Sequence, residues 1–215
     1  MNTNVLSLLG ASELKVPFNF DTDVNAPAFA EYITRDNKDD SSCAYITVGT
    51  GIGVGIVVNG NTVHGCMHPE AGHIMVQRKE SDLFPGVCPY HKCCIEGMCS
   101  STALASRKGL NISDLPLLSD DDEIWNICAY YLAQLCATLV LVVSPERIVF
   151  GGGIMNRECL LPKIRVFIFN FRLVDHSYLP LNVCQTFTRS MLNGYIQQPS
   201  IQTDDINRFI ARSAW

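Results

Sequence analysis

Residues 43–60 read CAYITVGTGIGVGIVVNG, and the central strands of the fold can be predicted from them. Its first six residues are β-branched, aromatic or small and apolar, which favours a β-strand over 43–48. The glycine-rich run GTGIGVG follows at 49–55, and IVVNG then passes through a glycine into NTVHG. This second part is typical of a β-hairpin. We therefore expect a strand, a glycine-rich turn and a hairpin of the same sheet.

On both sides of these residues, the chain alternates between helix-like and strand-like segments. Helices are predicted at 23–32, at 100–108 and from about residue 123 onward. Asp21 or Thr22 is placed to cap the first helix, and Gly109 to end the second. A polar linker is predicted over 110–122, and a strand over 147–154. This order predicts an α/β fold, in which ligands bind at the carboxyl ends of the strands.

One segment is apolar enough to suggest a membrane span. It is ICAYYLAQLCATLVLVV, residues 127–143. It is shorter than the ~20 residues that a bilayer requires, and it contains Gln134 and Thr138. It also runs directly into a Ser-Pro pair and a strand-like segment. We predict a buried core helix.

The composition is that of a globular protein with a substantial core. Of the 215 residues, 47% are hydrophobic and 17% charged. The net charge of −5, without a basic cluster, argues against nucleic acid as the main partner. We expect no signal peptide, and no disulfide scaffold despite the ten cysteines. Several cysteines lie in apolar surroundings and are predicted to be reduced core residues: Cys43, Cys128, Cys136 and Cys184.

A dense set of soft side chains lies between residues 68 and 97. The candidate metal ligands are His73, Cys88, His91 and Cys94. The last three form Cys-x2-His-x2-Cys, a spacing that suits a tetrahedral zinc site completed by a fourth ligand. Cys93 is an alternative to Cys94, or a further thiol. Glu70 and Glu96 are interleaved with these residues although structural zinc does not require them. We predict a metal-fixed loop built to hold a polar ligand.

Two glycine clusters are candidate sites for an anion. Gly49, Thr50, Gly51, Gly53 and Gly55 allow backbone N–H groups and a hydroxyl to approach a phosphate. Gly151, Gly152 and Gly153 end an apolar strand and fit either a nucleotide or a tight turn. Neither cluster is a Walker A motif or a Rossmann fingerprint. Because they flank the carboxylate-bearing loop, together they favour a phosphate-containing ligand.

Asp23 and Asn25 lie in FDTDVNA at the start of the first predicted helix. An Asp at this position usually caps the helix or interacts with its dipole, and the spacing alone favours that role. The functional alternative is a general base beside a substrate hydroxyl, with Asn25 and Thr22 fixing its geometry.

Five runs of the sequence, in this order, resemble the ROK family of sugar kinases. They are DTDVNA, YITVGTGIGVGIVVNG, HPEAGHI, CPYHKCCIEGM and SPERIVFGGGIM, and they look most like those of the zinc-containing fructokinases. The resemblance covers residues 10–165 and 191–213. It implies the actin-like, hexokinase-type ATPase fold, represented mainly by the large C-terminal domain. It also implies an enzyme that transfers the γ-phosphoryl group of ATP, with Mg²⁺, to the 6-hydroxyl of D-fructose.

The same resemblance assigns roles to the candidate residues. Asp23 matches the catalytic base. The sugar-binding positions are Thr22, Asn25, Glu70, His73 and Glu96, with Asn25 behind the others. Thr22 stands where many members have Asn, which favours fructose over glucose. The positions for ATP and its phosphates are Thr50, Gly51, Gly151, Gly152 and Gly153. The zinc ligands are His73, Cys88, His91 and Cys94, which hold a structural Zn²⁺ without an open position.

The chain also departs from the family pattern. Members begin with an Asp-x-Gly-Gly-Thr phosphate loop that is missing here, and they continue beyond the point at which RSAW stands. We therefore expect a chain shortened at both ends. Residues 1–40 would be the rest of the small N-terminal domain, carrying the Asp23 helix. Residues 41–215 would be the large domain with the zinc loop, and 167–189 an atypical insertion.

Two alternatives stay open beside a fructokinase. One is a ROK kinase for glucose, mannose or an N-acetylhexosamine. The other is an inactive, zinc-stabilised remnant that binds sugar. For the fructokinase and for the ROK kinase of another sugar, the partners are ATP and a hexose. Homodimers are common in the family that the sequence resembles, although no residue pattern here indicates one. We expect a cytoplasmic location and no nucleic-acid or membrane partner.

Overall fold

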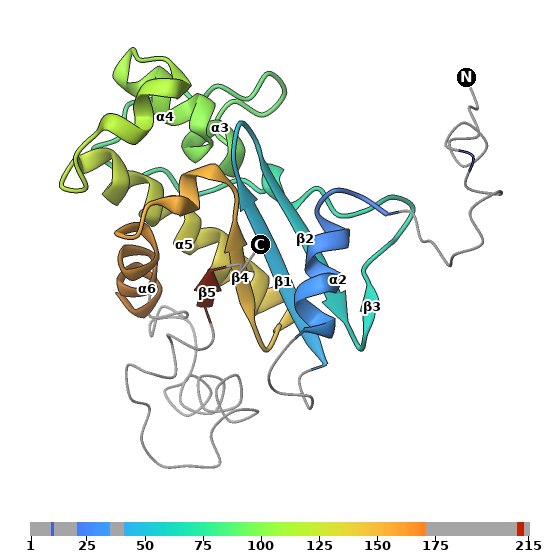
Figure 1. Ribbon diagram of the computed structural model, residues 1–215. Helices are drawn as coiled ribbons and strands as arrows, with labels where there is room; N and C mark the ends of the chain where they lie inside the picture. Colours follow the sequence, from blue (N-terminus) through green and yellow to red (C-terminus); the bar gives the residue numbers. More distant parts are fainter. Residues whose placement is uncertain (1–9, 11–20, 35–40, 171–209, 213–215) are drawn as a thin grey trace, which may run out of the picture.

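The computed structural model describes residue 10 and residues 21–34, 41–170 and 210–212, with side chains as far as residue 168. Its centre is a five-stranded sheet in the order β3-β2-β1-β4-β5 (Figure 1). The strands are β1 (Ser42–Val48), β2 (Ile52–Val58), β3 (Asn61–Thr62), β4 (Ile148–Gly151) and β5 (Ile210–Arg212). With helices on both faces, the molecule has the α/β class predicted from the sequence.

The predicted strand, turn and hairpin are present in the sheet. β1 and β2 are antiparallel, from the pair Ser42↔Val58 to the pair Val48↔Ile52, so only residues 49–51 separate them. β1 also pairs with β4, but in parallel, beginning at Ala44↔Ile148. Parallel neighbours end at the same edge of a sheet. The two glycine clusters, one after β1 and one at the end of β4, therefore lie at a common edge.

The alternation of side chains along β1 divides them between two faces. Ala44, Ile46 and Val48 belong to the main core, which includes the long helix α5 (Glu123–Val143). Cys43 and Tyr45 pack instead with Ala28 of α2 (Asn25–Ile33). In Figure 1, α2 lies in front of the sheet and α5 behind it, and α6 (Leu160–Asn170) packs beside α5.

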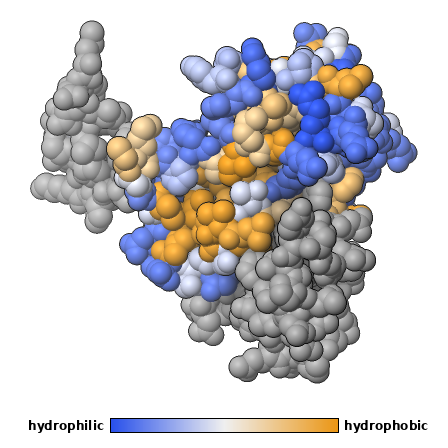
Figure 2. All heavy atoms as spheres, turned by 180° about the vertical axis from the view of Figure 1, so that it is seen from behind, coloured by the Kyte–Doolittle hydropathy of each residue, from blue (hydrophilic) through white to orange (hydrophobic). Residues whose placement is uncertain are grey.

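Helix α5 confirms the prediction of a core helix. Its buried residues include Trp125, Tyr131 and Leu135, and Asp122 caps its first turn by accepting a hydrogen bond from the Ile124 N–H at 3.0 Å. By length and composition the helix could cross a membrane, but one such helix is only weak evidence for a membrane span. Half of its most apolar 18-residue window, 50%, is buried inside the protein. From behind, apolar side chains gather in one area of the surface (Figure 2).

Two short helices follow the Cys/His-rich sequence. α3 (Ile95–Cys99) begins after Cys94, and α4 (Ser101–Lys108) begins after Ser100, whose hydroxyl accepts from the Ala103 N–H at 3.2 Å. Gly109 ends α4 with φ of +64°, as its position predicted.

Several predicted boundaries were wrong. The first helix starts at Asn25 rather than 23, because Asp21–Val24 form a separate turn. Strand β4 ends at Gly151 and leads into a 3-10 helix over Gly153–Asn156. The expected linker at 110–122 contains a 3-10 helix, Ile112–Leu117, because Leu115 is buried in the core. Most of the predicted insertion at 167–189, and Cys184, lie outside the described residues. Cys43, Cys128 and Cys136 are buried as predicted.

Candidate functional site

The predicted metal ligands come together in one cluster. The ligand atoms of His73, Cys88, His91 and Cys94 all lie within 4.8 Å of one another. Cys94 Sγ is 3.5 Å from His73 Nδ1, and Cys88 Sγ is 3.7 Å from Nδ1 of both histidines. Tetrahedral zinc with bonds of about 2.3 Å to sulfur and about 2.1 Å to nitrogen separates its ligands by about 3.6 Å. Two thiols and two imidazoles at these distances fit Zn²⁺, and four protein ligands leave no open position.

The local backbone explains how ligands so far apart in sequence meet. His73 ends a 3-10 helix, Ala71–His73, that packs closely on β2, because a Cβ at Gly72 would lie 1.8 Å from the Ile52 carbonyl oxygen. The second segment turns back between Cys88 and Lys92, which form a bridge, and Lys92 has φ of +56°. The 3-10 helix and the turn at Lys92 therefore bring the four side chains together.

Cys94, not Cys93, belongs to this cluster. Cys93 is half-buried and its sulfur is outside the group. Cys94 is fully buried, and its Sγ also accepts from the Gly97 N–H at 3.5 Å, capping α3. Burial raises the pKa of the Cys94 thiol to about 11. Burial also acts to raise the pKa of Cys88, but N–H groups of His91 and Tyr90 lower it on balance.

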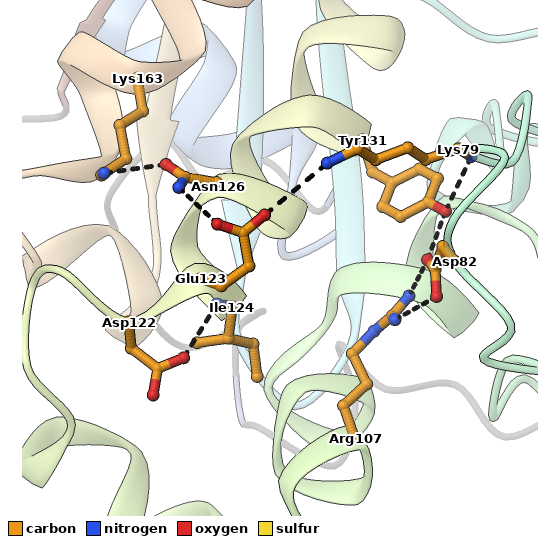
Figure 3. A network of polar contacts seen from close by, with 9 residues as sticks. All are labelled: Lys79, Asp82, Arg107, Asp122, Glu123, Ile124, Asn126, Tyr131 and Lys163. Carbon is orange, nitrogen blue, oxygen red and sulfur yellow. Dashed lines mark hydrogen bonds and ion pairs between the residues drawn. The ribbon is translucent and has the colours of Figure 1, made fainter.

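A buried ion pair connects the loop between His73 and Cys88 to helices α4 and α5 (Figure 3). Arg107 of α4 donates to both carboxylate oxygens of Asp82, at 2.7 and 2.8 Å, and Tyr131 of α5 donates to Oδ2 at 2.5 Å. The Arg107 guanidinium also lies over the Phe84 ring at 4.1 Å. The side chains of Asp82 and Arg107 are only 6% and 7% exposed.

This pair has a clear electrostatic consequence. Burial alone would raise the pKa of Asp82, but the hydrogen bonds from Arg107, Tyr131 and the Phe84 N–H lower it to about 2. Asp82 therefore stays ionised near neutral pH. Sequence reasoning missed this anchor, because an acid in a polar stretch gives no sign of a partner 25 residues away.

The two carboxylates predicted beside the Cys/His cluster, Glu70 and Glu96, have different environments. Glu70 is largely exposed and lies 2.8 Å from His68 Nε2. Glu96, in α3, accepts a hydrogen bond from the Ile52 N–H at the start of β2, at 3.0 Å. Glu96 therefore lies against the glycine turn, a contact that the sequence did not predict.

The turn before α2 is held by Asp21. Its carboxylate accepts from the Thr22 N–H at 2.7 Å, from Asn25 Nδ2 at 2.9 Å and from Thr62 Oγ1 at 3.0 Å, and His64 Nε2 lies 3.3 Å away. Burial would raise the pKa of Asp21, but these hydrogen bonds lower it to about 2. Sequence reasoning considered Asp21 only as a cap.

Asp23 is exposed at the apex of that turn. Thr22 Oγ1 accepts from the Asn25 N–H at 3.0 Å, and Asn25 is completely buried. Val24, which follows Asp23 in the chain, packs closely on β2: a Cβ at Gly55 would lie only 2.0 Å from the Val24 carbonyl oxygen. A carboxylate held on a fixed turn and open to solvent is available to act as a base.

A cavity of about 880 Å³ joins the two glycine clusters. Gly49 and Thr50 line it on one side, and Gly153 with Asn156 on the other. Its remaining walls include Ser101 and residues of the 3-10 helix Ile112–Leu117, among others. A cavity of this size accommodates a nucleotide-sized ligand.

The other predicted phosphate-site glycines do not line this cavity. Gly51 faces Glu96, and Gly151 lies against the Tyr45 side chain. Gly152 has φ of +91° and packs against Val48. At these positions glycine allows close packing or the turn itself. Of the residues that the resemblance assigns to ATP, Thr50 and Gly153 line the cavity.

The sequence matches the model of the ROK family over residues 5–177. The chain belongs to the ROK family. It is 38% identical over 183 residues to a fructokinase of Streptococcus mutans, an alignment covering 84% of this chain and 59% of the relative. It is 41% identical over 150 residues to a fructokinase of Zymomonas mobilis, with 69% and 50% of the two chains covered. The ROK chain thus spans between half and three-fifths of these relatives.

Solved ROK structures have the same fold. A ROK hexokinase from Thermus thermophilus superposes with a TM-score of 0.55 at 25% identity, covering 70% of this chain and 55% of the other. A ROK glucokinase from Streptomyces griseus, in complex with glucose and AMPPNP, gives 0.54 at 22% identity, with 79% and 62% covered. The predicted family and the actin-like, hexokinase-type ATPase fold are both confirmed.

Proposed function

We propose that this ROK protein is a fructokinase, which transfers the γ-phosphoryl group of ATP to the 6-hydroxyl of D-fructose. The observation that carries this proposal is the similarity, at 38% and 41% identity, to the two fructokinases. The cavity between the two glycine clusters supports the nucleotide half of the proposal. Because the chain spans less than two thirds of these relatives, the activity of the whole protein is part of what is proposed.

The residues of the chain suggest how the reaction proceeds. Asp23 takes the proton of the attacking hydroxyl, since its carboxylate is exposed on a turn fixed by Asp21 and Asn25. The Thr50 hydroxyl and the glycine N–H groups bind the phosphates. Mg²⁺ bound with ATP supplies the charge that neutralises the transferred group. The zinc ligands hold the loop of Glu70 and Glu96 rather than taking part in chemistry.

The choice of hexose is proposed from two features. The named fructokinases have higher identity than a glucokinase of Halalkalibacterium halodurans, at 31%, and an N-acetylmannosamine kinase of Vibrio vulnificus, at 29%. The second feature is Thr22, next to the proposed base Asp23, because the family resemblance relates Thr rather than Asn at this position to fructose. The proposed sugar contacts are Thr22, Glu70, His73 and Glu96, with the buried Asn25 behind them. The proposed ATP turns contain Thr50, Gly51, Gly151, Gly152 and Gly153.

The domain organisation and assembly are also proposals. We assign residues 1–40 to a small N-terminal domain and 41–215 to the large domain. We also propose a homodimer, for which the apolar area in Figure 2 is a suitable surface. The carboxyl end of α5 exposes Leu141 and Val142, at 48% and 76%. A cytoplasmic location is proposed because the kinase uses ATP.

The test is phosphorylation of fructose by the 215-residue chain with ATP and Mg²⁺, beside Asp23→Asn. We expect turnover in the wild type and a loss of at least about a hundredfold in the variant, the usual contribution of a general base. Glu80→Gln, an exposed acid of the metal loop, is the control. A panel of glucose, mannose and N-acetylmannosamine tests the hexose. Faster turnover of one of these would refute fructose, and sugar binding without turnover would favour a remnant.

A further inference from the structure

The carboxylate of Glu96 links the metal-carrying segment to the glycine turn after β1. Glu96 Oε2 accepts from the Ile52 N–H at 3.0 Å. Gly51 leaves the room for this contact, because a Cβ there would lie 2.5 Å from the same oxygen. Glu96 therefore fixes the end of the turn from which β2 starts.

Helix α4 holds the other end of the same turn. The Ser101 N–H donates to the Gly49 carbonyl oxygen at 2.8 Å, and Thr102 Oγ1 donates to the Thr50 carbonyl oxygen at 2.8 Å. Gly49, Thr50 and Ser101 also line the cavity. The cavity wall is thus set by contacts from α3 and α4 rather than by the β-hairpin alone.

These contacts continue into the metal cluster. Cys94, a member of the cluster, is the N-cap of α3, and its Sγ accepts from the Gly97 N–H at 3.5 Å. The Ile95 N–H donates to the Ile74 carbonyl oxygen at 2.9 Å, which ties α3 to the segment just after His73. Glu96 follows two residues after Cys94, so a shift of the helix start moves its carboxylate.

We propose that Glu96 is a positioning residue for the phosphate-binding turn, and that through it the metal loop sets the affinity for nucleotide. The proposal rests on the proposed function, because it takes the cavity as the nucleotide site. It adds that the metal loop, which the family resemblance relates to the sugar, also shapes the nucleotide side.

The test measures binding of a fluorescent ADP analogue to the metal-loaded chain, without sugar and without turnover. We expect Glu96→Ala to weaken binding about tenfold, which corresponds to about 1.4 kcal/mol. Glu96→Gln keeps an acceptor oxygen for the Ile52 N–H and should stay within about threefold of the wild type. Glu80→Ala removes an exposed carboxylate from the same loop and should bind as the wild type does. Removing the metal with a chelator should weaken binding of the ADP analogue more in the wild type than in Glu96→Ala, because the variant has already lost the Glu96 link.

Each outcome decides the proposal. Equal affinity of the wild type and Glu96→Ala would overturn it while leaving the kinase proposal intact. Equal effects of chelation on both proteins would overturn the link to the metal. A wild type that binds no ADP analogue would refute the nucleotide half of the proposed function and this inference together. Hydrogen exchange at the Ile52 amide is the second readout: it should accelerate in Glu96→Ala but not in Glu96→Gln, and unchanged exchange would refute the positioning role.

Discussion

The buried pair of Asp82 and Arg107 should contribute measurably to stability, and Asp82→Asn tests it. The pKa of Asp82 falls from 3.8 to about 2 on folding. Each pKa unit corresponds to about 1.4 kcal/mol, so ionisation of Asp82 adds about 2 kcal/mol to the free energy of unfolding at pH 7. Asn resembles the protonated acid, and Asp82→Asn should therefore cost about this amount. Asp82→Ala leaves the buried Arg107 charge without its partner and should cost about 3–5 kcal/mol.

The assay is reversible urea unfolding of the metal-loaded protein. Since the folded pKa lies below the unfolded value, the stabilisation is complete above the unfolded value of 3.8 and is lost as the pH falls toward 2. The difference between wild type and Asp82→Asn should be constant at neutral pH and shrink at acidic pH. Glu80→Gln, exposed on the same loop, should change stability by no more than about 0.5 kcal/mol. If Asp82→Asn unfolds at the wild-type urea concentration at pH 7, our account of the anchor is wrong.

Three further predictions concern the metal, the glycine turn and the sheet. The purified protein should carry about one zinc per chain. Elemental analysis should show that Cys88→Ser loses the zinc while Cys93→Ser keeps it. Loss of the metal in both variants would contradict the proposed ligand set. Gly51→Ala should displace the Glu96 carboxylate, because its Cβ would lie 2.5 Å from Oε2, and an undisturbed crystal structure would refute this. The Glu146 carboxylate accepts hydrogen bonds from two backbone N–H groups at the start of β1, at 2.9 and 2.6 Å. Glu146→Ala should therefore lower the free energy of unfolding by about 1–3 kcal/mol, measured by calorimetry. An unchanged melting temperature would contradict this prediction.

Sequence reasoning reached the local elements better than the contacts between them. The hairpin after residue 43 and the long helix from residue 123 follow from residue types, and both are present. The Cys/His cluster could be predicted because Cys-x2-His-x2-Cys is a short-range pattern, and the fold brings His73 to it. Boundaries were missed where tertiary packing decides, as with buried Leu115 in an otherwise polar stretch.

The long-range polar contacts had no local signal. Asp21 and Asp82 look like ordinary surface acids, yet each is held by side chains distant in sequence, Thr62 in one case and Arg107 in the other. Glu96 was predicted to contact a sugar, whereas the structure adds a backbone partner at Ile52. Such partners depend on how the sheet and helices meet, which a single sequence does not encode as a pattern.

The parallel pairing of β1 with β4 has a consequence for the kinetics of folding. The Ser42 N–H donates to the Glu146 carboxylate, and these residues are 104 positions apart. The chain must close this long loop before the pairing of β1 with β4 stabilises the protein. We therefore expect these two strands to pair late in folding. The cluster around Cys88 instead closes short segments, since Cys88 lies 15 residues from His73 and 3 from His91. We therefore expect the Cys/His cluster between the two strands to form before β1 and β4 pair.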